Sequence, residues 1–313
     1  MDDSFIALRH ITPMDFTALR YFHETARSGS IRRAAETLHV TPSSVSRAIA
    51  ALEHDLGAPL FERSRRGMTM TAAGTLLMRH TQRTFREFDR VRDAIDDLRG
   101  LHRGQVTLYA AEGLVAEFLP AVISDFAARH PQIGFDIRFE STDAIVGALI
   151  DDQADIGITF NGPMRNDIAA LAEHTEPICC LVCPDHPLAR HPRPGLCDVL
   201  AWPLALPETS FGMRRMVDTA IARSAGTARL AINTNSLELT KRVAMTGDAV
   251  AFMPGFMVRK DVAAGRLVAL HLDCPDLEAA RVTVCVHRDR ELSFAAKALS
   301  ALLVAHFRGL RAG

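Results

Sequence analysis

Residues Asp15 to Gly74 read DFTALRYFHETARSGSIRRAAETLHVTPSSVSRAIAALEHDLGAPLFERSRRGMTMTAAG. Apolar side chains recur here at the spacing of three and four residues that places them on one side of a helix. The pattern predicts three short helices. The first spans Asp15 to Ala26, and the second has Ser30 as its N-cap. The third begins at Thr41-Pro42 and ends at Gly57, because proline is favoured in the first turn of a helix and glycine at its end.

The third predicted helix has two chemically different sides. Apolar residues on one side are expected to face a core: Val45, Ile49, Leu52 and Leu56. The first turns of the other side carry short side chains and one arginine: Thr41, Pro42, Ser43, Ser46 and Arg47. Short side chains allow a helix to approach base edges, and arginine can bond guanine O6 and N7 together. This helix is therefore predicted to read the major groove of DNA.

Further arginines are placed to bind the phosphate backbone. Ser30, Arg32 and Arg33 lie at a predicted helix start, where backbone amides favour anions. Beyond the third helix, the alternation of Met68 to Thr71 predicts a small two-stranded wing, and its arginines are expected to follow the backbone or enter a minor groove. These wing residues are Arg63, Arg65 and Arg66. An ordinary three-helix bundle with solvated arginines is the alternative interpretation.

A long helix is predicted after the wing. Its apolar seam steps by four and three residues and consists of Leu77, Thr81, Thr84, Phe88, Val91, Ile95 and Leu98. Such a narrow seam buries little surface against a globular body. We expect it to contact another helix, most simply a second copy of the same chain in a dimer.

From residue 103 onward the pattern changes to alternating strands and helices, which is typical of an α/β fold. The predicted strands are 106–110, 135–139, 155–158, 178–182, 203–205, 229–232, 249–253 and 282–286, and the predicted helices are 114–129, 142–150, 213–225, 235–245 and 293–307. The last strand and helix are expected to return to the first group of strands. Two α/β lobes would leave a ligand-binding cleft near the ends of their strands.

Composition agrees with a folded protein of two or three domains, since 48% of the 313 residues are apolar and 23% are charged. The longest strictly apolar run, Ile178 to Cys183, is too short to span a membrane, and no export signal is visible at the start. We therefore expect a cytoplasmic protein without a membrane partner. The net charge is −1, but residues 1–100 carry 15 Arg, no Lys and 13 acidic residues. That slightly basic N-terminal third, whose Lys and Arg are all Arg, suits phosphate and guanine recognition.

The stretch from Asp15 to Gly74 strongly resembles the winged helix-turn-helix of LysR-type transcriptional regulators. The matching pieces are Gly29-Ser30, Ala34-Ala35, Leu38, Val40, Ser46-Arg47, Ile49, Leu52-Glu53, Leu56-Gly57, Leu60-Phe61, Arg63 and Thr71-Ala72-Ala73-Gly74. Later pieces also fit the family: Leu119-Pro120, Ala154 to Gly157, His186 to Ala189, Asn235-Ser236 and Met253-Pro254.

The resemblance implies a multidomain chain. An N-terminal all-α winged helix-turn-helix and a linker helix would precede a two-lobed α/β domain similar to type 2 periplasmic binding proteins. The expected divisions are an arm over 1–14, the DNA-binding domain over 15–74, the dimerisation helix over 75–102 and the effector-binding domain over 103–313. Lobe I would cover about 103–173 and 276–313, and lobe II about 174–275.

The resemblance also implies a function: a sequence-specific DNA-binding regulator controlled by a small molecule held between the lobes. The family's base-reading positions fall on Pro42, Ser43, Ser46 and Arg47, with Thr-Pro-Ser here in place of the common Ser-Gln-Pro. The implied effector-binding residues are Ala111, Glu112, Gly113, Thr159, Phe160, Asn161, Ser210, Phe211, Asn235, Met253 and Pro254. The implied partners are double-stranded promoter DNA, an unidentified effector, further copies in a dimer or tetramer, and RNA polymerase.

Many relatives hold a ligand carboxylate with a Ser or Thr hydroxyl near Gly113. This chain has none there, and Glu112 would oppose an anion. Two other readings of the two-lobed unit are a solute-binding protein and an enzyme. Neither a P-loop, an HExxH, a GxSxG nor a GxGxxG motif occurs, so we expect no catalysis and no cofactor.

The cysteines raise two further possibilities. Cys179, Cys180 and Cys183 lie near His186, but they fall in or beside a predicted buried strand, so we expect no metal site. Switching by thiol oxidation needs an accessible thiol of low pKa. Peroxide-sensing relatives carry their reactive cysteine in the loop that here reads ETSFG, where this chain has Phe211.

Overall fold

The computed structural model describes residues 15–64, 67–99, 103–115, 118–163, 165–191, 193–224 and 226–310. The expected arm over 1–14, together with Arg65 and Arg66, lies outside the described residues. The chain divides into two compact units, one up to Arg90 and one from Val91, which are described separately. Within the described ranges, none of the helices combines the length and apolar character that crossing a bilayer requires.

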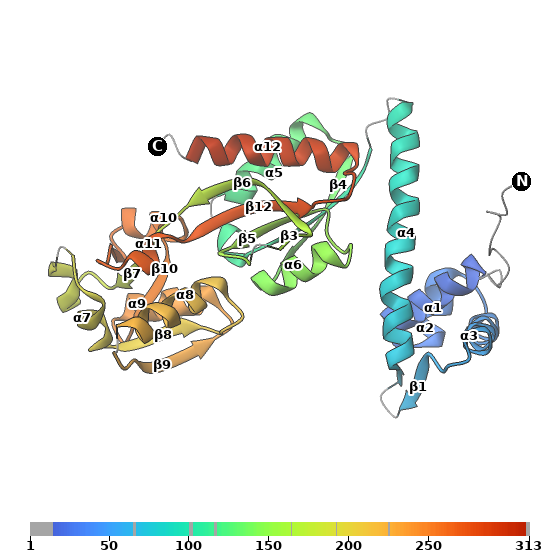
Figure 1. Ribbon diagram of the computed structural model, residues 1–313, viewed down its shortest axis with the longest axis horizontal. Coiled ribbons are helices and arrows are strands. Elements are labelled where there is room, and N and C mark those ends of the chain that lie inside the picture. Colours follow the sequence, from blue (N-terminus) through green and yellow to red (C-terminus); the bar gives the residue numbers. More distant parts are fainter. Residues whose placement is uncertain are drawn as a thin grey trace, which may run out of the picture. The chain divides into compact units, whose positions relative to one another are not determined.

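The first unit contains three short helices (Figure 1), and they begin where the sequence predicts. They are α1 (Phe16–Ser28), α2 (Ile31–Leu38) and α3 (Pro42–Leu56). The side chains of Asp15, Ser30 and Thr41 each accept a hydrogen bond from a backbone N–H in the first turn, which satisfies a donor the helix leaves unpaired. Gly29 and Gly57 end α1 and α3 with φ of 66° and 64°, a conformation that favours glycine.

The apolar sides of these helices form one core. Phe22 and Val45 are fully buried, and Ile49 and Leu52 of α3 are 3% and 2% exposed. The predicted wing is confirmed as an antiparallel pair of β1 (Phe61–Ser64) and β2 (Gly67–Met70). Glu53 of α3 holds the start of the wing, because its Oε1 accepts hydrogen bonds from the N–H groups of Leu60 at 2.7 Å and of Phe61 at 3.3 Å.

The long helix α4 (Ala72–Leu98) begins against the start of the wing. The Thr71 hydroxyl donates to the Pro59 carbonyl at 2.6 Å and accepts from the Gly74 N–H at 3.0 Å. A Cβ at Gly74 would lie 2.1 Å from the Leu60 carbonyl oxygen, so the backbones of helix and wing meet at a distance that only glycine allows.

The seam predicted along α4 is divided in two, which corrects the expectation of one continuous contact with another helix. In the first half, Leu77 packs against the core of the first unit and Thr81 is 3% exposed. Thr84 is exposed, and Phe16 of α1 places its ring edge-on against Phe85 and Phe88, with centroids 5.0 and 5.1 Å away. The second half of the seam is solvent-exposed: Phe88 at 57%, Val91 at 50%, Ile95 at 46% and Leu98 at 90%.

The second unit contains two five-stranded sheets, and the first defines one lobe. Its strand order is β4-β3-β5-β12-β6, with β3, β4 and β5 parallel to one another and β12 antiparallel to both of its neighbours. The strands are β3 (Gly104–Ala110), β4 (Ile133–Phe139), β5 (Ile156–Phe160), β6 (Ile168–Thr175) and β12 (Arg281–His287). Helices α5 (Phe118–Arg129) and α12 (Phe294–Leu310) cover one face and α6 (Thr142–Ile150) covers the other (Figure 1).

The second sheet defines the other lobe, with strand order β11-β7-β10-β8-β9. Its strands are β7 (Ile178–Val182), β8 (Pro203–Pro207), β9 (Arg229–Thr234), β10 (Val250–Pro254) and β11 (Val268–Leu270). Its helices are α7 (Leu196–Leu200), α8 (Gly212–Arg223), α9 (Leu237–Thr246), α10 (Arg259–Ala263) and α11 (Pro275–Glu278). All five residues of β7 are buried, as are all five of β10, which explains why their sequences read as unbroken apolar runs.

Two segments of chain cross between the lobes, and they run beside each other. One leads from β6 to β7 through Glu176, and the other leads into β12 through Ala280. The Glu176 N–H donates to the Ala280 carbonyl at 2.9 Å, so this pair continues the antiparallel β6–β12 ladder. A two-stranded hinge of this kind allows the lobes to change angle while each sheet stays intact.

The close approach at Gly74 gives a first prediction. Gly74→Ala should lower the stability of the DNA-binding unit by about 1–3 kcal/mol, because the new methyl group would overlap a backbone oxygen that has no free space to move into. This loss should exceed the gain of about 1 kcal/mol that alanine brings to a helix interior. Thermal unfolding followed by circular dichroism measures the effect. Thr75→Ala, at the next and exposed position, is the control, and equal stability of the two variants would contradict the assignment.

Candidate functional site

The exposed side of α3 is the candidate DNA-binding face. Thr41, Pro42, Ser43 and Arg47 are exposed and Ser46 is half-buried. Because the opposite side of the helix is anchored in the core, these residues are presented outward on a rigid element. The structure therefore places these five residues, four of which are the predicted base-reading positions, on one accessible surface.

Hydrogen bonds within this face show which groups remain free. The Thr41 hydroxyl caps the helix and lies 3.0 Å from the Ser43 Oγ and 2.9 Å from the Ser44 Oγ. The guanidinium of Arg47 has no hydrogen bond or ion pair to any part of the chain that the structure describes. Arg47 is thus available to a partner, whereas the Thr41 hydroxyl is already used to hold the helix start.

The predicted phosphate-binding residues lie at the start of α2. Arg32 and Arg33 are exposed, and Arg32 Nε donates to Glu36 Oε1 at 3.2 Å. Ser30 caps α2 by accepting from the Arg33 N–H at 3.5 Å. Arg63 belongs to β1 of the wing, and its side chain lies outside the described part of the structure.

A pocket lies between the two lobes of the second unit, and we call it the interlobe pocket. It opens to solvent, and its cavity volume is about 30 Å³. Its lining residues are Ala111, Glu112, Gly113, Leu114, Glu140, Ser141, Thr142, Phe160, Phe211, Gly212, Met213, Leu237, Pro254, Phe256, Met257 and Val282. Six of the eleven expected effector-binding residues are among them: Ala111, Glu112, Gly113, Phe160, Phe211 and Pro254.

Five expected residues do not line the pocket. Thr159 and Met253 are 3% and 0% exposed, because alternation along β5 and β10 turns them away from the cleft into packed interiors. Asn161 forms the turn after β5, with φ of 47° and its N–H donating to the Arg281 carbonyl at 2.7 Å. Ser210 and Asn235 lie in the loops before α8 and α9, one residue before the lining residue Phe211 and two residues before the lining residue Leu237 respectively.

Several lining residues were not predicted from the sequence. Ser141 and Thr142 have a readable signal, because Ser141 is the N-cap of α6 directly after a strand. Phe256 and Met257 have no such sequence signal, since they belong to a short 3-10 turn (Gly255–Met257) that no periodic pattern of apolar residues predicts.

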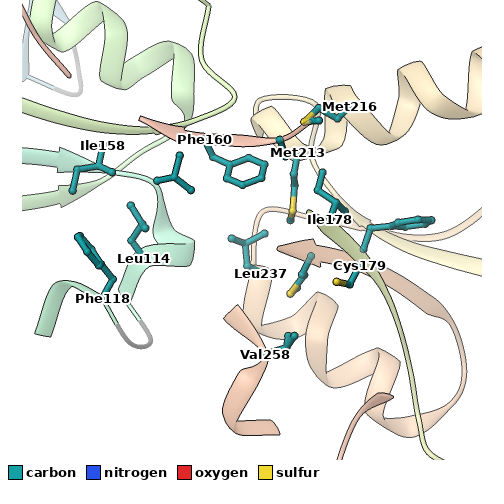
Figure 2. Packing of buried hydrophobic residues seen from close by; sticks show 14 of the residues in the cluster. Leu114, Phe118, Ile158, Phe160, Ile178, Cys179, Met213, Met216, Leu237 and Val258 are labelled. Carbon is teal, nitrogen blue, oxygen red and sulfur yellow. The ribbon is translucent and has the colours of Figure 1, made fainter. Parts of the chain in front are cut away.

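The two lobes touch across the pocket. Figure 2 shows Leu114 and Phe160 of one lobe facing Met213 and Leu237 of the other. A Cβ at Gly212 would lie 2.1 Å from the Phe160 carbonyl oxygen, so α8 begins in direct backbone contact with the end of β5. At the rim, Arg215 of α8 donates to Asp143 of α6 at 3.0 Å.

The charges in the pocket wall are acidic. Burial raises the pKa of Glu112, and the nearby Glu238 carboxylate raises it further. Glu140 is exposed. Within the lining there is no Lys, Arg or His.

The hinge borders a second, larger cavity of about 230 Å³. It is lined by Leu114, Phe118, Ala121, His174, Glu176, Phe256, Arg259, Val282, His306 and Phe307, three of which it shares with the interlobe pocket. Glu176 braces this region, because its Oε1 accepts from the Phe256 N–H at 2.8 Å and its Oε2 lies 3.1 Å from His174 Nε2. One crossing segment is thereby tied to the wall of both cavities.

The cysteines on the strands are packed in the interior. Cys179 and Cys180 of β7 are 2% and 0% exposed. Burial raises the pKa of the Cys179 thiol to about 11, and it also raises that of Cys285 to about 12. Their reactive thiolate forms are therefore disfavoured. Over the described ranges, no cluster of three or more His, Cys, Asp or Glu side chains is arranged to hold a metal ion.

Comparison with known families matches two models to this chain. Residues 16–75 match the bacterial regulatory helix-turn-helix proteins of the lysR family, and residues 99–308 match the LysR substrate binding domain. Together they cover most of the chain. The chain belongs to the LysR family of transcriptional regulators, which are DNA-binding proteins with an effector-binding domain.

Individual proteins agree with this assignment. The transcriptional dual regulator GltC of Bacillus subtilis is 32% identical over 244 residues, which cover 77% of this chain and 81% of GltC. The SDS degradation transcriptional activation protein of a Pseudomonas species is 28% identical over 93% of this chain and 95% of its own length. Among solved structures, full-length CbnR in complex with its target DNA has a TM-score of 0.67 at 22% identity, covering 94% of this chain and 99% of that one. Full-length OxyR from Pseudomonas aeruginosa has a TM-score of 0.72 at 21% identity, covering 93% and 94%.

The contact at Gly212 gives a second prediction. Gly212→Ala should destabilise the effector-binding unit by about 1–3 kcal/mol, because the added methyl would force α8 away from the Phe160 carbonyl. The matched control is Gly147→Ala in α6, where a Cβ would meet nothing within 4 Å. That change should stabilise the same unit by up to about 1 kcal/mol. Thermal unfolding of the full chain checks both, and a stabilising Gly212→Ala would show that the lobes are not in contact there.

Proposed function

We propose that α3 reads promoter DNA and that an effector in the interlobe pocket controls how the protein engages it. One observation carries the first half: the outer side of α3 is exposed and holds an unpaired Arg47, while its inner side is fixed in the core. A helix that is anchored on one side and carries short side chains at its start suits insertion into the major groove.

Arg32 and Arg33 are proposed to bind phosphates beside the recognition helix. Both are exposed at the start of α2 and are within a few residues of its capped N-terminus. Contacts of this kind orient a protein on the duplex without reading its sequence. Arg63, together with Arg65 and Arg66, is proposed to extend the same contact with the phosphate backbone.

The proposed control step uses the hinge and the pocket. A ligand that touches both lobes binds more tightly when they are closed, and this difference in affinity shifts the population towards the closed form. The end of α4 is fastened to the first lobe, because Arg103 Nε donates to Asp96 Oδ2 at 2.8 Å just before β3 begins. A change of lobe angle is proposed to act on α4 through this bond, with a coupling of about 1–3 kcal/mol between effector and DNA.

We further propose that the chain acts as a homo-oligomer joined through the exposed half of α4. The supporting feature is the row of Phe88, Val91, Ile95 and Leu98, which repeats at heptad spacing and is solvent-exposed in the single chain. Two copies would then present two recognition helices to half-sites on successive turns of the duplex.

The DNA-reading role is tested with Arg47→Ala. If Arg47 bonds a base, the variant should lose about 1–3 kcal/mol of affinity for the promoter fragment next to its own gene and much less for a random fragment of equal length. Mobility-shift titrations at one fixed ionic strength measure both. Arg308→Ala removes an exposed, unpaired arginine of α12 and is the charge-matched control. Equal loss on both fragments would contradict base reading and assign Arg47 to a phosphate.

The oligomer is tested with Ile95→Glu. A carboxylate in a helix–helix seam would lack a partner when buried, so we expect the variant to shift towards the monomer. Analytical ultracentrifugation gives the mass. Arg83→Glu introduces the same side chain at an exposed position off the row and should leave the mass unchanged. An unchanged mass for Ile95→Glu would place the interface elsewhere.

A further inference from the structure

The charges around the interlobe pocket indicate what kind of molecule it accepts. Two carboxylates, Glu112 and Glu140, are the charged groups of its lining, and cations are absent from that lining. Neither carboxylate has a hydrogen bond or ion pair to a side chain anywhere in the described part of the chain. A site built for an anion would instead present arginine, lysine or free N–H donors.

Glu112 is held in a poor environment for a charge. It lies at the start of a 3-10 turn (Glu112–Val115) beside apolar residues, and burial raises its pKa. The carboxylate of Glu238 adds a second repulsive effect on the same group. Removing water from a carboxylate is unfavourable unless a donor or a cation replaces that water. A bound cation would supply what the protein itself does not.

Two of the helix starts near the pocket, those of α6 and α9, do not favour an anion, whereas α8, whose first residues line the pocket, has no side-chain cap and no acidic residue in its first turn. The Ser141 hydroxyl caps α6 by accepting from Ala144, and Asp143 adds a negative charge to the same turn. The Ser236 hydroxyl likewise caps α9, whose first turn holds Glu238. The positive ends of both helices are thus already offset by oxygen atoms of the chain.

The nearby cations of α8 and α9 are committed to other groups, whereas Arg259, which lines the adjoining second cavity, has no hydrogen bond or ion pair to the described residues. Lys241 bonds Glu238 and Asp261, each at 2.9 Å, and Arg242 bonds Glu238 at 2.7 Å. Arg215 at the rim is paired with Asp143. A ligand carboxylate would have to break one of these pairs to gain a counter-ion from α8 or α9, and it would still meet Glu112.

The remaining wall is apolar and partly aromatic. Its large side chains are Leu114, Phe160, Phe211, Met213, Leu237 and Phe256. Such a surface favours an apolar body, and phenylalanine rings also attract cations to their faces.

We propose that the effector of this pocket is a small organic cation: an apolar or aromatic body carrying an ammonium or amidinium group, with Glu112 as its counter-ion and Glu140 as a second, exposed carboxylate. The proposal rests on the proposed function, since it names the chemical class of the molecule that acts in this pocket. Thr142 takes no direct part, because its hydroxyl donates to the Phe160 carbonyl at 3.0 Å.

Three probes of matched size test the ligand class on the full-length chain: 2-phenylethylamine, 2-phenylethanol and 3-phenylpropionate. Isothermal titration calorimetry at neutral pH measures their affinities. We expect the amine to bind at least about tenfold more tightly than the alcohol and the carboxylate to bind most weakly, in line with one charge-assisted contact. Tighter binding of 3-phenylpropionate than of the amine, or no binding of the amine, would overturn the proposal.

Variants locate the effect. In Glu112→Gln the affinity for the amine should fall to that for the alcohol, while the affinity for the alcohol changes little. Glu291→Gln, which removes an exposed carboxylate of the same unit, should leave all three affinities unchanged. Glu140→Gln should reduce the affinity for the amine to a smaller extent. It is the test variant to use if Glu112→Gln does not fold. Unchanged amine binding in both pocket variants would also overturn the proposal.

The DNA readout separates this proposal from the function on which it rests. Amine binding that depends on Glu112 but leaves promoter binding unaltered would support the ligand class and contradict effector control through this pocket. Binding and promoter response to the carboxylate probe would support effector control and contradict the ligand class.

Discussion

The hydrogen-bonded pair of crossing segments at Glu176 and Ala280 is the constraint on which the effector-binding unit depends. Because the chain passes between the two sheets along this ribbon, each sheet can pack its own helices while the two lobes still share one cleft. The same segment carries Glu176, whose carboxylate holds the Phe256 N–H at the wall of the pocket. The geometry of the cleft and the angle between the lobes are therefore set by the same few bonds.

In the first unit, the packing leaves one side of α3 exposed to solvent. Val45, Ile49 and Leu52 are buried in the core, and this burial fixes α3 in place while its other side stays exposed to solvent. Glu53 extends this order to the wing by accepting two backbone N–H groups. Rigidity of the presenting element lowers the entropy that must be lost when DNA is bound.

Local rules explain how much of this was readable from the sequence. The caps at Ser30 and Thr41, the helix end at Gly57 and the helix over 142–150 follow from residue chemistry within one or two turns, and the structure confirms them. Strand β6 (IAALAEHT) was not predicted, because its alanines carry no alternation and its strand form depends on pairing with the distant β12. The division of the α4 seam was missed for a related reason, since Phe16 covers part of the helix from far away in the chain. Of the expected effector-binding residues, six line the pocket, whereas Thr159 and Met253 are buried by alternation along their strands, which a family pattern does not encode. Their roles, and those of the DNA-facing residues, remain predictions.

The arginines on the exposed side of the first unit have a consequence for regulation. Residues 1–100 contain no lysine, so the charge that faces DNA rests on guanidinium groups alone. A guanidinium stays protonated throughout the physiological pH range. It is also not a substrate for the acetylation that neutralises lysine. The charge that these side chains contribute is consequently constant, so neither pH nor acetylation adjusts the attraction that they exert on a nucleic acid.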